Sequence, residues 1–139
     1  MEAYQHIVQY YETDKMQITH HSNSIRWMEE ARIDFMKQIG WPYEKLEEEG
    51  IISPVTAIDC KYRASTTFPD VVTIHVSVAE CKPVVLRISY TMTNETGKTV
   101  FEGHSEHCFL SQEGKIVRID KTAPAFFEAL KECVEQEKC

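Results

Sequence analysis

The feature that most constrains the fold is a change of hydrophobic period along the chain. Apolar and polar residues alternate in three runs, as expected for strands with one buried face: residues 72–78, 86–92 and 101–109. Turn-forming residues at Lys82-Pro83 and Asn94–Gly97 separate these runs, which is typical of hairpin-connected antiparallel strands. We expect two further strands of the same sheet, over residues 4–12 and 52–65.

Before these strands the period is that of a helix. Five apolar residues recur at steps of three and four: Ile25, Met28, Ala31, Phe35 and Ile39. Ser22 or Asn23 can cap the start, and Gly40 can end the helix, so we predict a helix of roughly 17 residues. A short acidic helix over residues 42–49 and a last helix capped by Thr122 complete the pattern. Within the long helix, Glu29 and Arg32 are expected to form a surface ion pair.

This element order predicts an α+β fold, in which an antiparallel sheet is covered on one face by one long helix. The 139 residues suffice for one domain, and we expect residues 1–139 to form it. The formal net charge of −7 argues against nucleic-acid binding. Five irregularly spaced cysteines form no C-x-x-C pair, and no basic leader or long apolar run is present. We therefore expect a reduced cytoplasmic protein without membrane insertion.

The segment between the first strand and the long helix carries the candidate chemistry. An acidic residue, Asp14, precedes a short polar loop that leads into the helix start near His21 and Asn23. Such a loop brings one carboxylate close to the free N–H groups of a helix N-terminus. A carboxylate beside backbone donors is what the attack of water on an acyl group requires. The pattern therefore points to an enzyme with Asp14 as its candidate residue.

The same segment resembles the 4-hydroxybenzoyl-CoA thioesterase family, through the motif Y-E-T-D-x-M-x-I-x-H-H-x-N from Tyr11 and W-x-E-x-A-R from Trp27. The resemblance implies the hotdog fold, in which an antiparallel sheet wraps around a long central helix. It implies hydrolysis of an acyl-CoA thioester to a carboxylic acid and CoA. It also implies at least a homodimer, or a homotetramer, with active sites at the subunit interface. CoA would be part of the substrate, and no metal or organic cofactor is expected.

Residue roles follow from the same resemblance. Asp14 would act as nucleophile or as general base, and the backbone N–H of His21 would polarise the thioester carbonyl. Asn23 would hold the loop. Gln17 stands where relatives often have glycine, so a side chain occupies a loop position that usually permits close backbone approach at the acyl entrance. Substrate and CoA contacts are expected from basic residues of the sheet region and from two hydroxyl residues offered by a partner subunit: Lys61, Arg63, Lys82, Arg87, Ser65 and Thr66.

Other interpretations remain open from the residues alone. Asp14 could be an ordinary turn residue, and the histidine pair could be structural, because adjacent side chains of an extended segment point apart. His104 and His107 fall on opposite faces of a strand, which disfavours a metal site. A hotdog hydratase would need a histidine within residues 25–39, where none occurs. An acyl carrier protein thioesterase and a non-catalytic acyl-CoA or lipid-binding module stay as alternatives.

Overall fold

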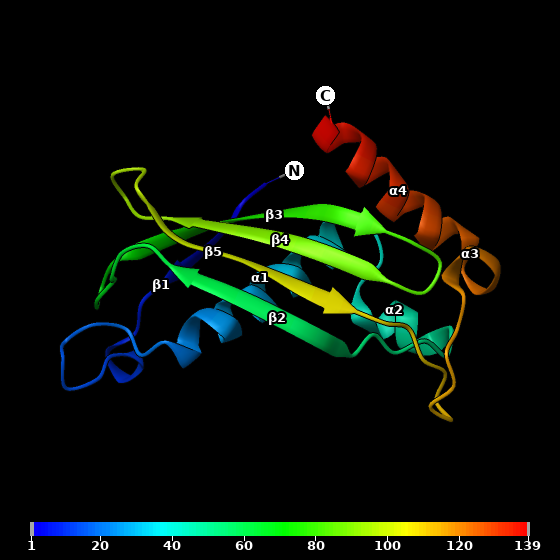
Figure 1. Ribbon diagram of the computed structural model, residues 1–139, viewed down its shortest axis with the longest axis horizontal. Helices are drawn as coiled ribbons and strands as arrows, with labels where there is room; N and C mark the ends of the chain where they lie inside the picture. The colour runs from blue at the N-terminus through cyan, green and yellow to red at the C-terminus, as the bar shows by residue number, and fades with distance from the viewer. Residues whose placement is uncertain (1, 139) are drawn as a thin grey trace.

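The computed structural model describes residues 2–138, which form an antiparallel sheet with helices packed against it (Figure 1). The sheet has five strands in the order β1-β3-β4-β5-β2. Their bounds are β1 Tyr4–Ile7, β2 Val55–Tyr62, β3 Val71–Cys81, β4 Leu86–Thr93 and β5 Thr99–His107. The predicted α+β class and the hairpin connections of the last three strands are confirmed.

The long helix α1 (Ser22–Gln38) lies across one face of the sheet (Figure 1). Its apolar stripe is buried at Trp27, Met28, Ala31, Phe35 and Met36. Facing residues of the strands are equally buried, including Ile74, Ile88 and Met92. Each large apolar side chain that leaves water contributes roughly 1.5–3 kcal/mol, so this interface supplies much of the driving force for folding.

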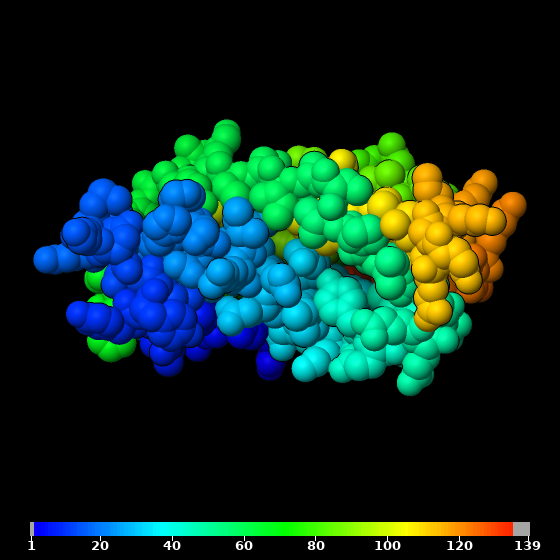
Figure 2. Space-filling view, turned by 90° about the horizontal axis from the view of Figure 1, so that it is seen from below, coloured from blue at the N-terminus to red at the C-terminus, as the bar shows by residue number. Residues whose placement is uncertain are grey.

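Shorter elements pack at the ends of this two-layer core. Helix α2 (Tyr43–Glu48) follows α1 as predicted, and helix α4 (Pro124–Lys138) packs on β3. The predicted cap at Thr122 is wrong, because Thr122 ends a separate short helix, α3 (Ile119–Thr122). Figure 2 shows the N-terminal segment, in blue, at one end of the molecule and the turn that precedes α3, in orange, at the other.

The first predicted strand is shorter than expected. β1 ends at Ile7, and a 3-10 turn, η1 (Tyr10–Glu12), replaces the rest of the predicted run. The reason is local: the Glu12 carboxylate accepts a hydrogen bond from the backbone N–H of Gln9 at 2.8 Å, which closes the turn. The chain is thereby folded back toward α1 before it reaches Asp14.

A chain of buried polar groups crosses the core from α1 to the far end of β5. Arg32 donates to the hydroxyls of Tyr43 and Tyr90 at 3.0 Å each, so the predicted ion pair with Glu29 is wrong. Tyr90 then lies 2.6 Å from the Ser105 hydroxyl, which is 2.8 Å from Nε2 of His107. Nδ1 of His107 faces a backbone carbonyl, so the chain needs a neutral imidazole that accepts at Nε2.

Burial and the nearby Arg32 cation lower the pKa of His107 from 6.5 to about 4. Unfolding frees this histidine to take up a proton below pH 6.5, whereas the folded protein resists protonation down to about pH 4. We expect the free energy of unfolding to fall by about 1.4 kcal/mol for each unit by which the pH is lowered within this window.

Urea denaturation at pH 7.5, 6 and 5 tests this dependence. The variant His107→Gln is expected to be less stable at pH 7.5 but to lose less stability toward pH 5. His75→Gln, which changes an exposed histidine of β3, serves as the control and should keep the wild-type slope. Equal slopes for wild type and His107→Gln would contradict the assignment.

Candidate active site

The loop that carries Asp14 is a tight, internally bonded structure. The backbone N–H of Asp14 donates to the carbonyl of Ile18 at 3.0 Å, and that of Gln17 donates back to the Asp14 carbonyl at 2.9 Å. Oδ1 of Asp14 accepts from the backbone N–H of Met16 at 2.8 Å, which is the bond of an Asx turn. Oδ2 has no partner among the described residues, so the half-buried carboxylate keeps one oxygen for chemistry.

Gln17 adopts the left-handed conformation, with φ of 65°. A side chain there is disfavoured, which explains why glycine suits this position in relatives. The side chain is exposed and lines the same hollow as Asp14 rather than filling the loop. The backbone of the loop is therefore kept despite the substitution.

The start of α1 differs from the predicted cap. His21 occupies the N-cap position without any side-chain cap, and the ring of His20 lies beside Ser22 instead. Nδ1 of His20 is 3.2 Å from the backbone nitrogen of Ser22 and 2.8 Å from its hydroxyl. The backbone N–H of His21 donates to no group in the described part of the chain. This helix start therefore presents a free donor at its positive end.

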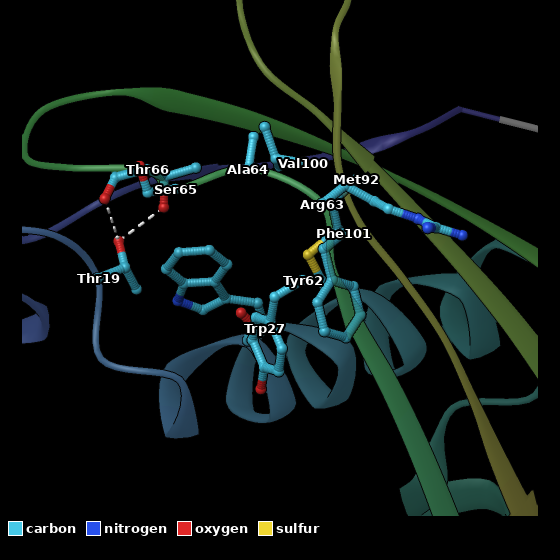
Figure 3. Close-up of a pocket in the computed structure, with 11 residues that line it drawn as sticks. Thr19, Trp27, Tyr62, Arg63, Ala64, Ser65, Thr66, Met92, Val100 and Phe101 are labelled. Carbon is cyan, nitrogen blue, oxygen red and sulfur yellow. Dashed lines mark hydrogen bonds between the residues drawn. The ribbon is translucent and has the colours of Figure 1, made fainter.

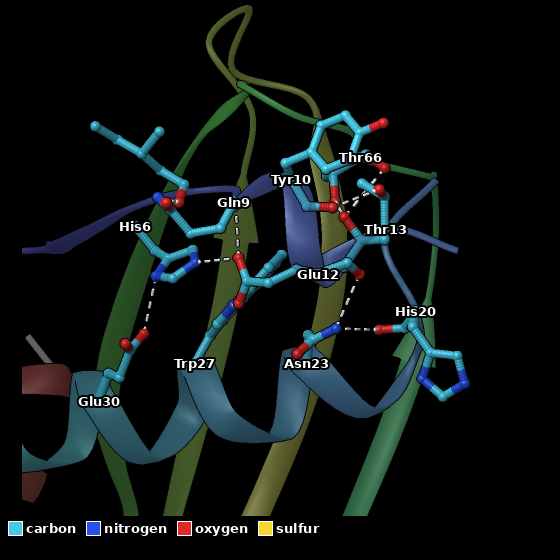
Figure 4. A network of polar contacts seen from close by, with 12 residues as sticks. His6, Gln9, Tyr10, Glu12, Thr13, His20, Asn23, Trp27, Glu30 and Thr66 are labelled. Carbon is cyan, nitrogen blue, oxygen red and sulfur yellow. Dashed lines mark hydrogen bonds and ion pairs between the residues drawn. The ribbon is translucent and has the colours of Figure 1, made fainter. Parts of the chain in front are cut away.

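Asn23 joins the loop to the helix (Figure 4). Its side-chain nitrogen donates to the backbone carbonyl of Glu12 at 2.9 Å and to that of His20 at 3.4 Å. These bonds fix the two ends of the segment that contains Asp14 against the first turn of α1. Replacing this side chain would loosen the spacing between Asp14 and the free N–H of His21.

Residues of this segment line two hollows. The open one, of about 680 Å³, contains Asp14 and Gln17 together with Tyr10, Thr67 and Phe68. The more enclosed one, of about 210 Å³, lies between the start of α1 and the sheet (Figure 3). It is lined by aromatic, aliphatic and hydroxyl side chains, among them Trp27, Tyr62, Phe101, Met92, Ser24, Ser65 and Thr66.

A hydrogen-bonded pair of threonines lines the enclosed hollow where it approaches the open one. The backbone N–H of Thr19 donates to the carbonyl of Thr66 at 2.8 Å, and their hydroxyls are 2.6 Å apart. Thr19 and Thr66 line the enclosed hollow, while their neighbours Gln17 and Thr67 line the open one. Asp14 therefore shares no wall with the enclosed hollow within one chain.

The six predicted substrate contacts do not gather at one place in this chain. Ser65 and Thr66 line the enclosed hollow, and Arg63 lies beside them. Lys82 follows the last residue of β3, whereas Ser65 and Thr66 precede its first residue. An eleven-residue strand separates the two ends by about 35 Å, so Lys82 belongs to the opposite end of the sheet.

Most of the predicted cationic groups are already paired. Arg63 contacts Glu102 at 2.9 Å, and Lys82 contacts Glu80 at 2.9 Å. Arg87 lies 3.3 Å from Asp59. Lys61 has no acidic partner within the described residues. Of the four basic side chains in this set, Lys61 is thus the one without an ion-pair partner among the described residues.

Two site features were not assigned from the sequence. The hydroxyl of Tyr62 donates to the carbonyl of His21 at 2.6 Å, so β2 holds the helix start. Trp27 is buried and also lines the enclosed hollow. The spacing of Trp27 on α1 shows that it faces the sheet, but no local pattern could show a cavity there.

No described helix is both long and apolar enough to cross a membrane. Among the side chains that the structure describes, those of residues 2–134, no group of three or more histidine, cysteine or acidic side chains is placed to hold a metal ion.

Comparison with known proteins identifies the family. The Thioesterase-like superfamily model matches residues 8–132. An inferred esterase of Aquifex aeolicus (strain VF5) is 35% identical over 118 residues, which are 85% of this chain and 91% of that protein. An inferred acyl-CoA thioesterase of Bacillus subtilis (strain 168), YneP, is 28% identical over 123 residues, covering 88% and 89% respectively.

Solved structures agree. A DHNA-CoA thioesterase from Staphylococcus aureus superposes with a TM-score of 0.92 at 29% identity, over 99% of this chain and 95% of that one. The chain therefore belongs to the Thioesterase-like superfamily. It has the hotdog fold and is a thioester hydrolase, as the resemblance implied.

The strained position in the loop yields a testable expectation. Gln17→Gly removes the left-handed strain, which costs the folded protein about 1–2 kcal/mol. Glycine's greater freedom in the unfolded chain offsets about 0.5–1 kcal/mol of this gain. We expect a net gain in stability of about 0.5 kcal/mol, measured as a rise in urea midpoint. Gln17→Ala, which shortens the side chain but keeps the strain, is the matched control. A Gln17→Ala protein as stable as Gln17→Gly would contradict the expectation.

Proposed function

We propose that this chain hydrolyses an acyl-CoA thioester to a carboxylic acid and CoA, with Asp14 and the backbone N–H of His21 as the reacting groups. The supporting observation is that one short, hydrogen-bonded segment carries two unsatisfied groups. One oxygen of the Asp14 carboxylate and the N–H of His21, the N-cap residue of α1, lack partners in the described chain. Asn23 and Tyr62 hold the segment between them.

The reaction follows from these two groups. As general base, Asp14 takes a proton from water while the water oxygen bonds to the thioester carbon. The carbonyl oxygen becomes an oxyanion, which accepts a hydrogen bond from His21 N–H at the positive end of the helix. The tetrahedral intermediate then expels the CoA sulfur, which leaves with the proton. As nucleophile, Asp14 would instead form a mixed anhydride that water hydrolyses. Neither route needs a metal or an organic cofactor.

CoA is the proposed donor because two relatives carry the names of CoA thioesterases. The motif assigns the chain more narrowly to the 4-hydroxybenzoyl-CoA thioesterase family. We expect Lys61, the unpaired basic residue of β2, to meet the CoA phosphates, with Arg63, Ser65 and Thr66 nearby. An acyl carrier protein donor and a non-catalytic binding module are the competing functions.

A second copy of the chain is the proposed partner. Strand β2 is the edge of the sheet, and its side chains Val55, Ile58 and Tyr62 are 38–49% exposed. An exposed apolar edge strand is a template for pairing with another strand. Pairing of β2 with β2 of a partner would join the two sheets and bring Asp14 of one subunit toward the other. A homodimer is therefore expected, with a homotetramer formed from two such pairs.

The proposed role of Asp14 is tested by Asp14→Asn. The amide keeps the size and the bond to Met16 N–H but cannot accept the proton, so kcat/KM should fall about 10²–10⁴-fold. Thiol release from a panel of acyl-CoAs is the measurement. Glu113→Gln, the same chemical change on an exposed turn, is the control and should retain activity.

Three outcomes would contradict the proposal. Full thiol release by Asp14→Asn would exclude Asp14 as base or nucleophile. CoA binding without thiol release by the wild type would favour the binding module. Activity confined to acyl carrier protein substrates would make the acyl carrier protein, and not CoA, the donor.

The proposed dimer is tested by Ile58→Lys. A charge on the edge strand should prevent pairing of β2 and leave a monomer in analytical ultracentrifugation. Lys61→Ile, on the same strand, serves as a control and should remain associated. A wild type that sediments as a monomer with full activity would overturn the dimer. Circular dichroism checks that each variant is folded.

A further inference from the structure

The enclosed hollow is small and has a well-defined wall on the side of α1. Its volume is about 210 Å³. A cavity of about 150 Å³ in another protein holds one benzene ring, and drug-sized ligands need about 300–1,000 Å³. The hollow is therefore of a size for one ring or a similarly short chain.

Trp27 forms the wall on the helix side (Figure 3). It projects from the second turn of α1 toward the sheet and is 2% exposed. Its ring nitrogen donates to Oε2 of Glu12 at 2.8 Å. The indole cannot turn away from the hollow without leaving this buried N–H and the facing carboxylate oxygen unpaired.

Glu12 is itself fixed on several sides (Figure 4). Its Oε1 is 2.8 Å from Nε2 of His6 and accepts from the backbone N–H of Gln9 at 2.8 Å. The ring of His6 packs on Trp27 with centroids 4.7 Å apart, and its other nitrogen lies 2.9 Å from Glu30. The contact between His6 and Glu30 is within ion-pair distance, but its geometry is not that of a hydrogen bond. These groups position the indole from β1, η1 and α1 together.

The opposite wall is equally fixed. The ring of Phe101 lies against Gly103, where a Cβ would come within 2.9 Å of the ring. Tyr62 packs edge-on to Phe101 at 5.3 Å and is anchored to the carbonyl of His21. Neither aromatic wall can retreat easily to admit a larger group.

We infer that Trp27 is the specificity-determining residue of the acyl pocket and that Glu12 is its positioning residue. Trp27 limits the acyl group to about one six-membered ring or a chain of about six carbons. The inference rests on the proposed thioesterase function, with the thioester at the helix start and the acyl group in the enclosed hollow. Ser24, at the helix start, lines the same hollow and connects the two places.

The test is a panel of straight-chain acyl-CoAs from two to about twelve carbons, together with benzoyl-CoA. For the wild type we expect kcat/KM to fall about tenfold or more beyond about six carbons. Trp27→Phe should move this limit to longer chains, because a smaller ring deepens the hollow. The profile of each variant is expressed relative to its own activity on the shortest substrate, so that a general loss of activity does not move the limit.

Trp41→Phe is the matched control. Trp41 is the other tryptophan of the chain, and it packs on Phe126 away from the hollow. Its substitution should leave the chain-length limit unchanged. In this background Trp27 is the single tryptophan, so its fluorescence reports the position of the indole directly.

Glu12 is tested in the Trp41→Phe background. Glu12→Ala should shift the Trp27 emission to the red and flatten the chain-length profile, because the indole loses its acceptor. Glu12→Gln keeps an acceptor oxygen and should restore both the emission and most of the discrimination. A merely structural role of Glu12 would lower the stability without this rescue of the profile.

Several outcomes would overturn the inference. An unchanged length limit in a folded Trp27→Phe protein would remove Trp27 from specificity, and Trp27→Leu repeats the test if Trp27→Phe does not fold. A wild type that hydrolyses chains of all lengths equally would also overturn it, while leaving the proposed thioesterase function intact. A wild type that hydrolyses no thioester would instead defeat the proposed function.

Discussion

The buried carboxylate of Glu12 is the interaction on which the site geometry depends. It is 5% exposed and binds His6 of β1, Gln9 before η1 and Trp27 of α1. Burial by itself raises the pKa of Glu12, but the hydrogen bonds from His6, Gln9 and Trp27 more than offset this, so the pKa is lowered. The carboxylate is therefore held in its charged form at neutral pH, where it joins three elements that are distant in sequence.

The backbone of Glu12 fixes both ends of the loop that carries Asp14. Its carbonyl accepts from the Asn23 side chain and from the N–H of His20, so the chain leaves Glu12 and returns to the same place eight residues later. The intervening loop has little freedom, because Thr19 is bonded to Thr66. A carboxylate and a free helix-start N–H are thus held on one frame, and such preorganisation is what stabilises charge in a transition state.

The sequence predicted the parts of the molecule that depend on periodicity. The strands β3, β4 and β5 and the helix α1 follow from alternation and from the apolar stripe, because both patterns reflect one buried face. It could not predict that Glu12 closes a 3-10 turn or that Arg32 turns inward to Tyr43 and Tyr90. The turn depends on a buried carboxylate and Arg32 on partners farther along the chain, whereas an acidic or basic side chain is by default expected at the surface.

The candidate site, like the fold, was only partly predictable from the sequence. Asp14 and His21 were found through the motif, and their unpaired atoms agree with the proposed roles. Lys82 lies at the opposite end of β3 from Ser65 and Thr66, which the resemblance assigns to a partner subunit, so their contact with one substrate stays a prediction. The aromatic hollow around Trp27 could not be predicted from the sequence, because its walls come from α1, β2 and β5 and no local pattern indicates a cavity.

The proposed chemistry requires that the free N–H of His21 receive the thioester carbonyl beside Asp14. An NMR titration of the amide-labelled protein tests this requirement, with a non-hydrolysable acyl-CoA analogue that carries a ketone in place of the thioester. We predict that the His21 amide proton shifts downfield and becomes protected from exchange on saturation. An unshifted His21 amide in a protein that binds the analogue would contradict the proposed role of this N–H.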